Sequence, residues 1–241
     1  MNTEFAFMNT ISSILEQVYE VNKDNIKIAT EKFAQNMAGN HLIHTFGTGH
    51  SHMMGIEMFS RAGGLANINP LLDPDTLTMF GSRRSGEIEK LSGVADIIYD
   101  NNFISKDDIM IISSNSGRNA MPIEMALRCK KEGVYVIAIT SLKQSMETTS
   151  RHSSGKKLYE IADLVLDNCA PAGDTCLEFG GYETGSTSSI TSLFILDTIV
   201  SEAVKYMVEH GQKPYVFQSQ NVDTSNNVEA YMKYMGRVKY L

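Results

Sequence analysis

The segment Ile109-Met-Ile-Ile-Ser-Ser-Asn-Ser-Gly-Arg-Asn119 joins a buried strand to a polar loop. Its first four residues are all apolar, as in a strand that is covered on both faces of a parallel sheet. The apolar pattern that follows the loop predicts a helix from about Asn119 to Glu132, which Gly133 ends. A strand, a polar loop and a helix in this order indicate an α/β domain.

A second unit of the same kind lies upstream. His41–Phe46 is a predicted strand, Gly47-Thr-Gly-His-Ser51 is a tight glycine loop, and Met53–Phe59 is an apolar helix. In parallel sheets, ligands bind beyond the carboxyl ends of the strands, where the chain changes direction. Both polar loops are expected at those ends.

The remaining elements are predicted from hydrophobic period and from turn residues. They are a helix from about Thr3 to Met37, a short strand at Leu65–Asn69, an edge strand at Ala95–Tyr99, strands at Val134–Ile139 and Leu164–Leu166, a long loop at Asp167–Gly185, a helix at Thr187–Glu209 and an amphipathic turn near Val228–Met235. The fold class that they predict is α/β, a doubly wound parallel sheet with helices on both faces and an N-terminal helix.

The composition limits the classes of function. The 241 residues, of which 42% are hydrophobic, suit one domain, with an N-terminal helix at 1–39, a core at 40–212 and a tail at 213–241. A formal net charge of −7, without a basic run, argues against nucleic-acid binding and against anionic membranes. No apolar stretch approaches the ~20 residues that a membrane helix needs.

The cysteines and the N-terminal residues indicate the cytoplasm. Cys129, Cys169 and Cys176 are widely spaced and form no CxxC motif, so they suggest no disulfide framework. Glu4 and polar residues precede any apolar run, which is unlike a signal peptide.

Each polar loop has two interpretations. In the first loop, Gly47 and Gly49 either allow backbone amides to approach an anion at a helix start or form only a structural turn. The third position of a dinucleotide-binding glycine motif holds His52, and no P-loop lysine follows. In the second loop, one of the residues Ser113–Asn119 could cap the helix. Capping needs only one such residue, so the excess of hydroxyl and amide groups favours an anion cradle.

These motifs resemble the SIS (sugar isomerase) domain family, which includes the phosphoheptose isomerases. The resemblance rests on the glycine loop that ends in Ser51 and on Ser114-Asn-Ser-Gly-Arg-Asn119, which is similar to the Ser-x-Ser-Gly-x-Thr/Ser motif of the family. Stretches such as Phe46–His52, Arg61–Gly64 and Ser150–Lys156 are most similar to a subfamily described as phosphosugar isomerases. The resemblance implies a flavodoxin-like SIS fold over nearly the whole chain.

The resemblance also implies roles for individual residues. Ser114, Ser116 and Asn119 would hold a sugar phosphate, although Asn119 replaces the usual hydroxyl residue, and Ser51 would lie against the sugar or the phosphate. The remaining residues assigned to the ligand-binding loops are Gly47, Thr48, Gly49 and Asn115.

Glu57 is the candidate general base. It lies among apolar residues of a helix that starts at the ligand loop, and burial would suit it to proton abstraction. The alternative is an ion pair with Arg61, four residues further on. His50 or His52 could open a sugar ring, or could serve only as hydrogen-bonding groups. A metal site at His50 and His52 is not expected, because no carboxylate or cysteine lies at a supporting spacing.

The function that follows is sugar-phosphate binding with aldose–ketose isomerisation, which needs no cofactor. A non-catalytic sugar-phosphate sensor, or a lyase or etherase acting on an amino-sugar phosphate, remains an alternative. Glu178 and Glu183 are candidates for a second acid or base. A homodimer or homotetramer is expected, because the first and last long helices carry more apolar residues than one sheet face requires.

Overall fold

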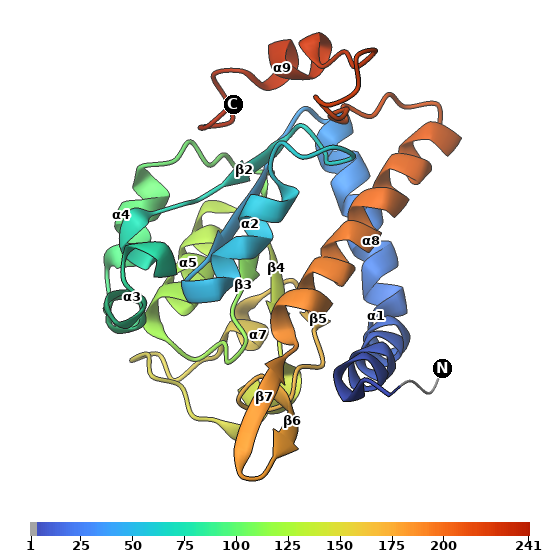
Figure 1. Cartoon of the computed structure of the whole chain (residues 1–241). Coiled ribbons are helices and arrows are strands. Elements are labelled where there is room, and N and C mark those ends of the chain that lie inside the picture. The colour runs from blue at the N-terminus through green and yellow to red at the C-terminus, as the bar shows by residue number, and fades with distance from the viewer. Residues whose placement is uncertain (1–3) are drawn as a thin grey trace.

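Five apolar segments form one parallel sheet in the computed structural model, which describes residues 4–241 (Figure 1). The order of the strands is β2-β1-β3-β4-β5, which confirms the doubly wound α/β fold. The strands are β1 (Ile43–Gly47), β2 (Ile68–Pro70), β3 (Ile109–Ser113), β4 (Tyr135–Thr140) and β5 (Leu164–Asp167).

Alternation along each strand divides the core into two layers. Ile109 and Ile111 pack on one face with residues of the long helices, whereas Met110 and Ile112 pack on the other. The first face is covered by α1 (Ala6–Ala38), α2 (Met53–Met58) and α8 (Ser188–Glu209). The second is covered by α4 (Val94–Asp100), α5 (Ala120–Glu132) and α7 (Leu158–Ile161).

Side chains of α1 complete the hydrogen bonding of the edge strand β5. Asn22, which is buried, donates to the Asp167 carbonyl at 2.7 Å and accepts from the Asp167 amide at 2.8 Å. Asn25 donates to the Val165 carbonyl at 2.8 Å. The helix thereby occupies backbone groups that an edge strand would otherwise leave unpaired.

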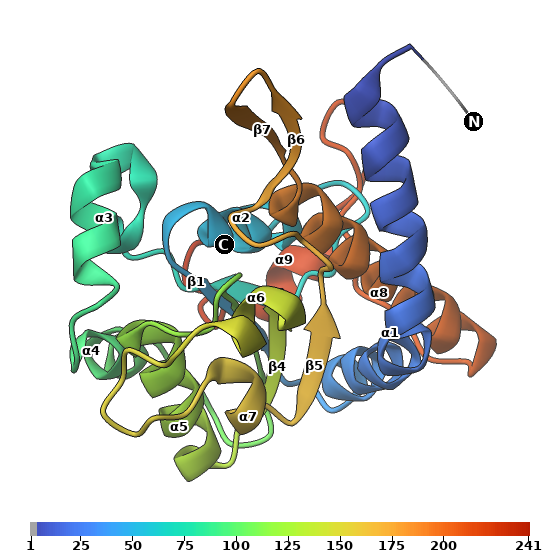
Figure 2. The same ribbon diagram turned by 90° about the horizontal axis from the view of Figure 1, so that it is seen from below.

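The register of the sheet brings the two polar loops together. Gly47, the last residue of β1, lies opposite Ser113, the last residue of β3. The short helix η1 (Gly49–His52) follows β1, and α5 follows the second loop. Figure 2 looks onto this edge of the molecule, where α6 (Leu142–Glu147) also lies. The predicted placement of both loops at one sheet edge is confirmed.

The predicted edge strand at Ala95–Tyr99 is wrong, because these residues form α4. Ala95, Ile98 and Tyr99 are buried at a spacing of three and four, while Ile97 is exposed. The run is too short for its period to be read without tertiary contacts. The preceding segment forms η2 (Pro74–Thr76), η3 (Thr78–Phe80) and α3 (Ser82–Ile88).

The predicted long loop at Asp167–Gly185 contains a hairpin, which corrects the sequence interpretation. Strands β6 (Thr175–Phe179) and β7 (Tyr182–Ser186) pair antiparallel and project from the body of the protein (Figure 1). Gly180 and Gly181 form the turn and both have a positive φ, which is the turn geometry that fits strand twist.

The C-terminal tail crosses the opposite end of the sheet (Figure 1). It contains α9 (Val228–Tyr234), where an amphipathic turn was expected, and buries Phe217, Tyr234 and Val238 against Leu42. The start of the N-terminal helix predicted at Thr3 lies outside the described residues. None of the helices within residues 4–241 is long and apolar enough to cross a bilayer.

Candidate ligand-binding site

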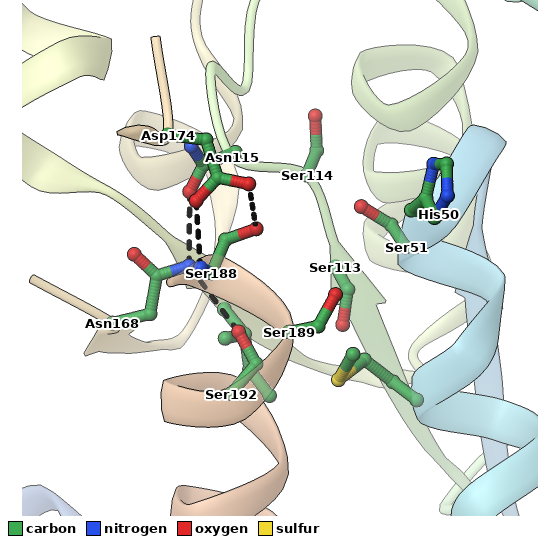
Figure 3. A pocket seen from close by; sticks show the side chains of 12 residues that line it. His50, Ser51, Ser113, Ser114, Asn115, Asn168, Asp174, Ser188, Ser189 and Ser192 are labelled. Atoms are coloured by element: carbon green, nitrogen blue, oxygen red, sulfur yellow. Dashed lines mark hydrogen bonds between the residues drawn. The ribbon is translucent and has the colours of Figure 1, made fainter. Parts of the chain in front are cut away.

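A polar cavity of about 200 Å³ opens at the carboxyl ends of β1 and β3 (Figure 3). Its volume is below the roughly 300–1,000 Å³ of pockets for drug-sized ligands, so it suits a smaller molecule. Its walls come from both polar loops, from the ends of β4 and β5 and from the start of α8. The lining residues are His50, Ser51, Met54, Ser113, Ser114, Asn115, Ile139, Asn168, Asp174, Ser188, Ser189 and Ser192.

A chain of side-chain amides fixes one wall of the cavity. Asn115 donates to Gln144 at 2.9 Å and accepts from Asn168 at 2.9 Å. The buried Asn168 amide group lies 3.2 Å from the Ser192 hydroxyl. The chain connects the second loop, α6, the end of β5 and α8, so the wall is held by four separate elements.

Unlike the side-chain amides, the hydroxyl groups of Ser113 and Ser114 are not fixed by bonds to other side chains of the described residues. Ser114 accepts a hydrogen bond from the Gly117 amide at 3.2 Å, which tightens the second loop and leaves the hydroxyl proton available. Ser113 is 5% exposed, and within residues 4–241 its hydroxyl has no hydrogen-bond partner. A buried hydroxyl without a partner is costly, so it is satisfied when a polar ligand or water occupies the cavity.

Glycine is required at two positions of the loops. A Cβ on Gly47 would lie 2.6 Å from the Ser51 carbonyl oxygen, so only glycine permits this turn. Gly117 has a φ of 55° and lies under α7, where Leu158 donates its amide to the Gly117 carbonyl at 3.0 Å.

Glu89, which directly follows α3, joins the two loops. Thr48 of the first loop donates its hydroxyl to Glu89 at 2.6 Å, and the Asn119 amide of the second loop donates to the other carboxylate oxygen. Arg151 donates to the Asn119 side-chain oxygen at 3.0 Å. Thr48 and Asn119 are therefore held by these partners and do not line the cavity.

The comparisons with known proteins agree with this architecture. A family model described as "SIS domain" matches residues 6–141, which is more than half of the chain. UPF0309 protein BH3325 of Halalkalibacterium halodurans is 38% identical over 212 residues, 87% of this chain and 88% of that protein. A UPF0309 protein of Geobacillus thermodenitrificans is 36% identical over 239 residues, covering 98% of this chain and 96% of the relative.

The chain belongs to the SIS-domain family.

Solved structures share the SIS fold at low identity. Phosphoheptose isomerase GmhA from Neisseria gonorrhoeae has a TM-score of 0.56 and 16% identity, over 82% of this chain and 95% of that one. The Vibrio vulnificus NanR protein complexed with ManNAc-6P has a TM-score of 0.54 and 15% identity, over 85% of this chain and 63% of that one.

Part of the predicted site of this SIS domain lies in the cavity. His50, Ser51, Ser114 and Asn115 line it, whereas Gly47, Thr48, Gly49, Ser116 and Asn119 belong to the two loops without lining it. His52 is buried and its ring contacts the Gly49 carbonyl, so His50 is the histidine that faces the cavity.

Glu57 lies one helical turn beyond Met54, outside the cavity lining. Its side chain is 34% exposed and forms an ion pair with Arg61, which is 46% exposed. The ion pair is the arrangement that the sequence offered as the alternative to a buried base. In this structure the Glu57 carboxylate therefore pairs with Arg61 and does not line the cavity.

The wall that α8 contributes was not predicted from the sequence. Ser188, Ser189 and Ser192 lie on the first turns of α8, and Asp174 lies on the loop after β5. The serine-rich start of the last helix was the available signal, because a helix that follows a parallel strand begins near its carboxyl end. Nothing in the sequence pattern placed Asp174 beside it.

The thiols of the SIS domain are not placed for nucleophilic chemistry. Burial raises the pKa of Cys129 and of Cys169 to about 12, so both stay protonated near neutral pH. Within residues 4–241, no group of three or more histidine, cysteine or acidic side chains is arranged to hold a metal ion.

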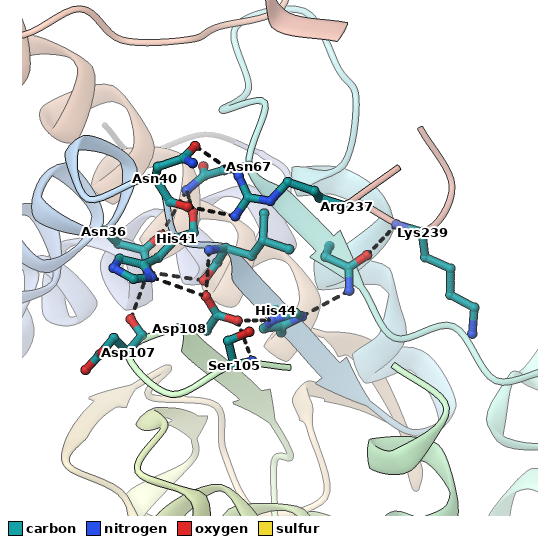
Figure 4. Close-up of polar contacts among 12 residues, drawn as sticks. Asn36, Asn40, His41, His44, Asn67, Ser105, Asp107, Asp108, Arg237 and Lys239 are labelled. Carbon is teal, nitrogen blue, oxygen red and sulfur yellow. Dashed lines mark hydrogen bonds and ion pairs between the residues drawn. The ribbon is translucent and has the colours of Figure 1, made fainter. Parts of the chain in front are cut away.

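His44 lies at the opposite end of the sheet, in a buried polar network (Figure 4). Asn69 donates to its Nδ1 at 3.0 Å, so Nε2 carries the proton and donates to Asp108 at 3.0 Å. Burial alone would raise the pKa of Asp108, but hydrogen bonds from His44, Leu42 and Ser105 lower it. The network ties β1 to β3 and lies apart from the cavity.

We predict that Glu89→Ala loosens both loops. The substitution leaves two partly buried donors unpaired, so the free energy of unfolding should fall by roughly 1–3 kcal/mol in urea denaturation. Amide hydrogen exchange should increase at residues 47–52 and 114–119. Glu87→Ala is the matched control, because the exposed Glu87 side chain forms its ion pair with Lys90 and not with either loop. Equal effects of the two variants would contradict the role of Glu89.

Proposed function

We propose that the cavity binds a sugar phosphate. The observation on which this depends is that two glycine- and serine-rich loops meet where the chain connections diverge at the carboxyl ends of β1 and β3, in a cavity lined mainly by hydroxyl and amide groups. Such groups hydrogen-bond both phosphate oxygens and sugar hydroxyls. The complex of the structurally similar NanR protein with ManNAc-6P supports the proposal.

We place the phosphate against Ser51 of the first loop and Ser114 of the second. Ser116 and Asn119, which the family resemblance also assigns to the phosphate, lie on the second loop. Within the described chain no lysine or arginine lines the cavity, so we propose that hydroxyl and backbone N–H donors of the two loops stabilise the phosphate charge. Gly49 has a φ of 58° and open space where a Cβ would point, so a ligand can approach the backbone there.

Ser51→Ala and Ser114→Ala should each weaken sugar-phosphate binding by roughly 1–3 kcal/mol, because each removes a donor to an anion. Isothermal calorimetry against a panel of sugar phosphates measures the effect. Ser12→Ala, on the exposed face of α1, is the control for a serine outside the cavity and should bind as the wild type does. Unchanged affinity in both cavity variants would refute the anion cradle.

The reaction that we propose is aldose–ketose isomerisation of the sugar phosphate. It needs a base that moves a proton between adjacent carbons and a group that opens the ring. His50 lines the cavity and is the proposed ring-opening residue. Glu57 remains the proposed base, and it acts only if its carboxylate leaves Arg61 when a ligand binds.

Proton–deuterium exchange into a panel of sugar phosphates in heavy water tests this reaction by NMR. Wild-type protein should catalyse exchange into at least one ligand, and Glu57→Gln should slow it by ~10²–10⁴-fold while binding persists. Glu31→Gln, on α1, is a control away from the cavity. Full exchange with Glu57→Gln would move the base elsewhere.

A non-catalytic sugar-phosphate sensor is the second candidate. The Glu57–Arg61 ion pair favours it, because the carboxylate is neutralised by a neighbour and does not face the cavity. Binding of a sugar phosphate without exchange into it in the same experiment would decide for the sensor.

We also propose that the whole chain is one domain, that it acts in the cytoplasm and that it forms at least a homodimer. The three free cysteines support the cytoplasm. Tyr19, Val21 and Ile28 on α1 and Val208 on α8 are exposed apolar residues that a second copy would cover. Light scattering at micromolar concentration should give at least twice the mass of one chain, and a monomer would refute the assembly.

A further inference from the structure

Asp174 is the one acidic residue among the described residues that line the cavity. No lysine or arginine of the described chain offsets its charge there, and the other polar lining groups are hydroxyls, amides and His50. Figure 3 shows Asp174 beside Ser188, with Ser51 and His50 on the opposite wall. The cavity therefore has an anionic wall and a neutral wall.

The start of α8 holds the Asp174 carboxylate in place. Oδ1 accepts from the Thr187 amide at 3.1 Å, from the Thr187 hydroxyl at 3.3 Å and from the Ser188 amide at 2.6 Å. Oδ2 accepts from the Ser188 hydroxyl at 2.8 Å. These amides are among those that a helix start leaves unpaired, and they are the groups that would otherwise bind an anionic ligand.

Two consequences follow for a ligand. The N-terminus of α8 already has its anion, so a phosphate belongs on the opposite wall with Ser51 and Ser114. Oδ2 accepts from the Ser188 hydroxyl and retains acceptor capacity, since a carboxylate oxygen accepts two hydrogen bonds. A hydroxyl or ammonium group of the ligand can donate to it, whereas a second carboxylate would be repelled.

We infer that Asp174 orients the sugar phosphate and selects its class. The phosphate lies against the two loops, the other end of the sugar faces α8, and ligands with a hydroxyl or amino group at that end bind in preference to sugar acids. The inference rests on the proposed sugar-phosphate function. It disfavours an etherase substrate whose ether substituent carries a carboxylate.

The test compares three probes that share one phosphorylated carbon chain. They are glucose 6-phosphate, glucosamine 6-phosphate and 6-phosphogluconate, whose first carbon is a carboxylate. Calorimetry with the wild-type protein should show that 6-phosphogluconate binds at least roughly tenfold more weakly than glucose 6-phosphate. The reason is the repulsion between its carboxylate and that of Asp174 in a partly buried site. Asp174→Asn should reduce the ratio of these two dissociation constants by roughly tenfold or more. Glucosamine 6-phosphate should lose more affinity for this variant than glucose 6-phosphate does.

Asp174→Asn and Asp174→Ser both remove the charge and retain a side-chain oxygen, and asparagine is the closer match because its amide oxygen can still accept from the Thr187 and Ser188 amides. Asp24→Asn, at an exposed position of α1, is the control for the loss of one negative charge and should leave the ratio unchanged. If glucose 6-phosphate and glucosamine 6-phosphate bind, and both Asp174 variants leave the affinity ratio of 6-phosphogluconate to glucose 6-phosphate unchanged, the inference alone is overturned. Failure of all three probes to bind the wild-type protein refutes the proposed function together with it.

Discussion

The register between β1 and β3 is the constraint on which the site depends. Gly47 and Ser113 end neighbouring strands at the same level, and the chain then leaves in opposite directions, toward β2 after β1 and toward β4 after β3. The diverging connections leave a crevice that no helix fills. A one-residue slip would turn Ile109 and Ile111 to the other face, so the buried layers fix the register and the register fixes the crevice.

Polar contacts then give the crevice its chemistry. Glu89 holds both loops by their side chains, and the amide chain through Asn115 and Asn168 attaches the second loop to α8. These bonds use groups that would otherwise face the ligand, which makes Thr48 and Asn119 part of the scaffold. The groups left for a ligand are mainly hydroxyls, which can donate or accept and so suit a molecule with many oxygens.

The sequence predicted the structure correctly where a feature depends on residues within a single strand or loop. The apolar run Ile109–Ile112 predicted a buried strand, and Gly47 and Gly117 indicated the two loops, because those features are local. The strand predicted at Ala95–Tyr99 was wrong because tertiary packing decides which side of a short apolar segment is buried. The hairpin was missed although Gly180-Gly181 is a strong turn signal.

The candidate site could be predicted only in part, for the same physical reason. Ser51 and Ser114 follow their strands directly, so the sheet edge places them, whereas Asp174 reaches the cavity through hydrogen bonds to a helix start that follows an intervening hairpin. The inward turn of Asn119 depends on Glu89, thirty residues away. Contacts between distant segments leave no periodic trace in the sequence.

The charges of the cavity limit the chemistry that the proposed sugar-phosphate site can perform. Proton abstraction next to a carbonyl requires a base that faces the ligand, and the described cavity offers His50 and an Asp174 carboxylate that already accepts four hydrogen bonds. Such a carboxylate is better suited to holding a sugar hydroxyl than to taking a proton, because protonation would remove its charge and weaken its bonds to α8. The proposed isomerisation would therefore require the Glu57 carboxylate, on the short helix that borders the cavity through Met54, to separate from Arg61.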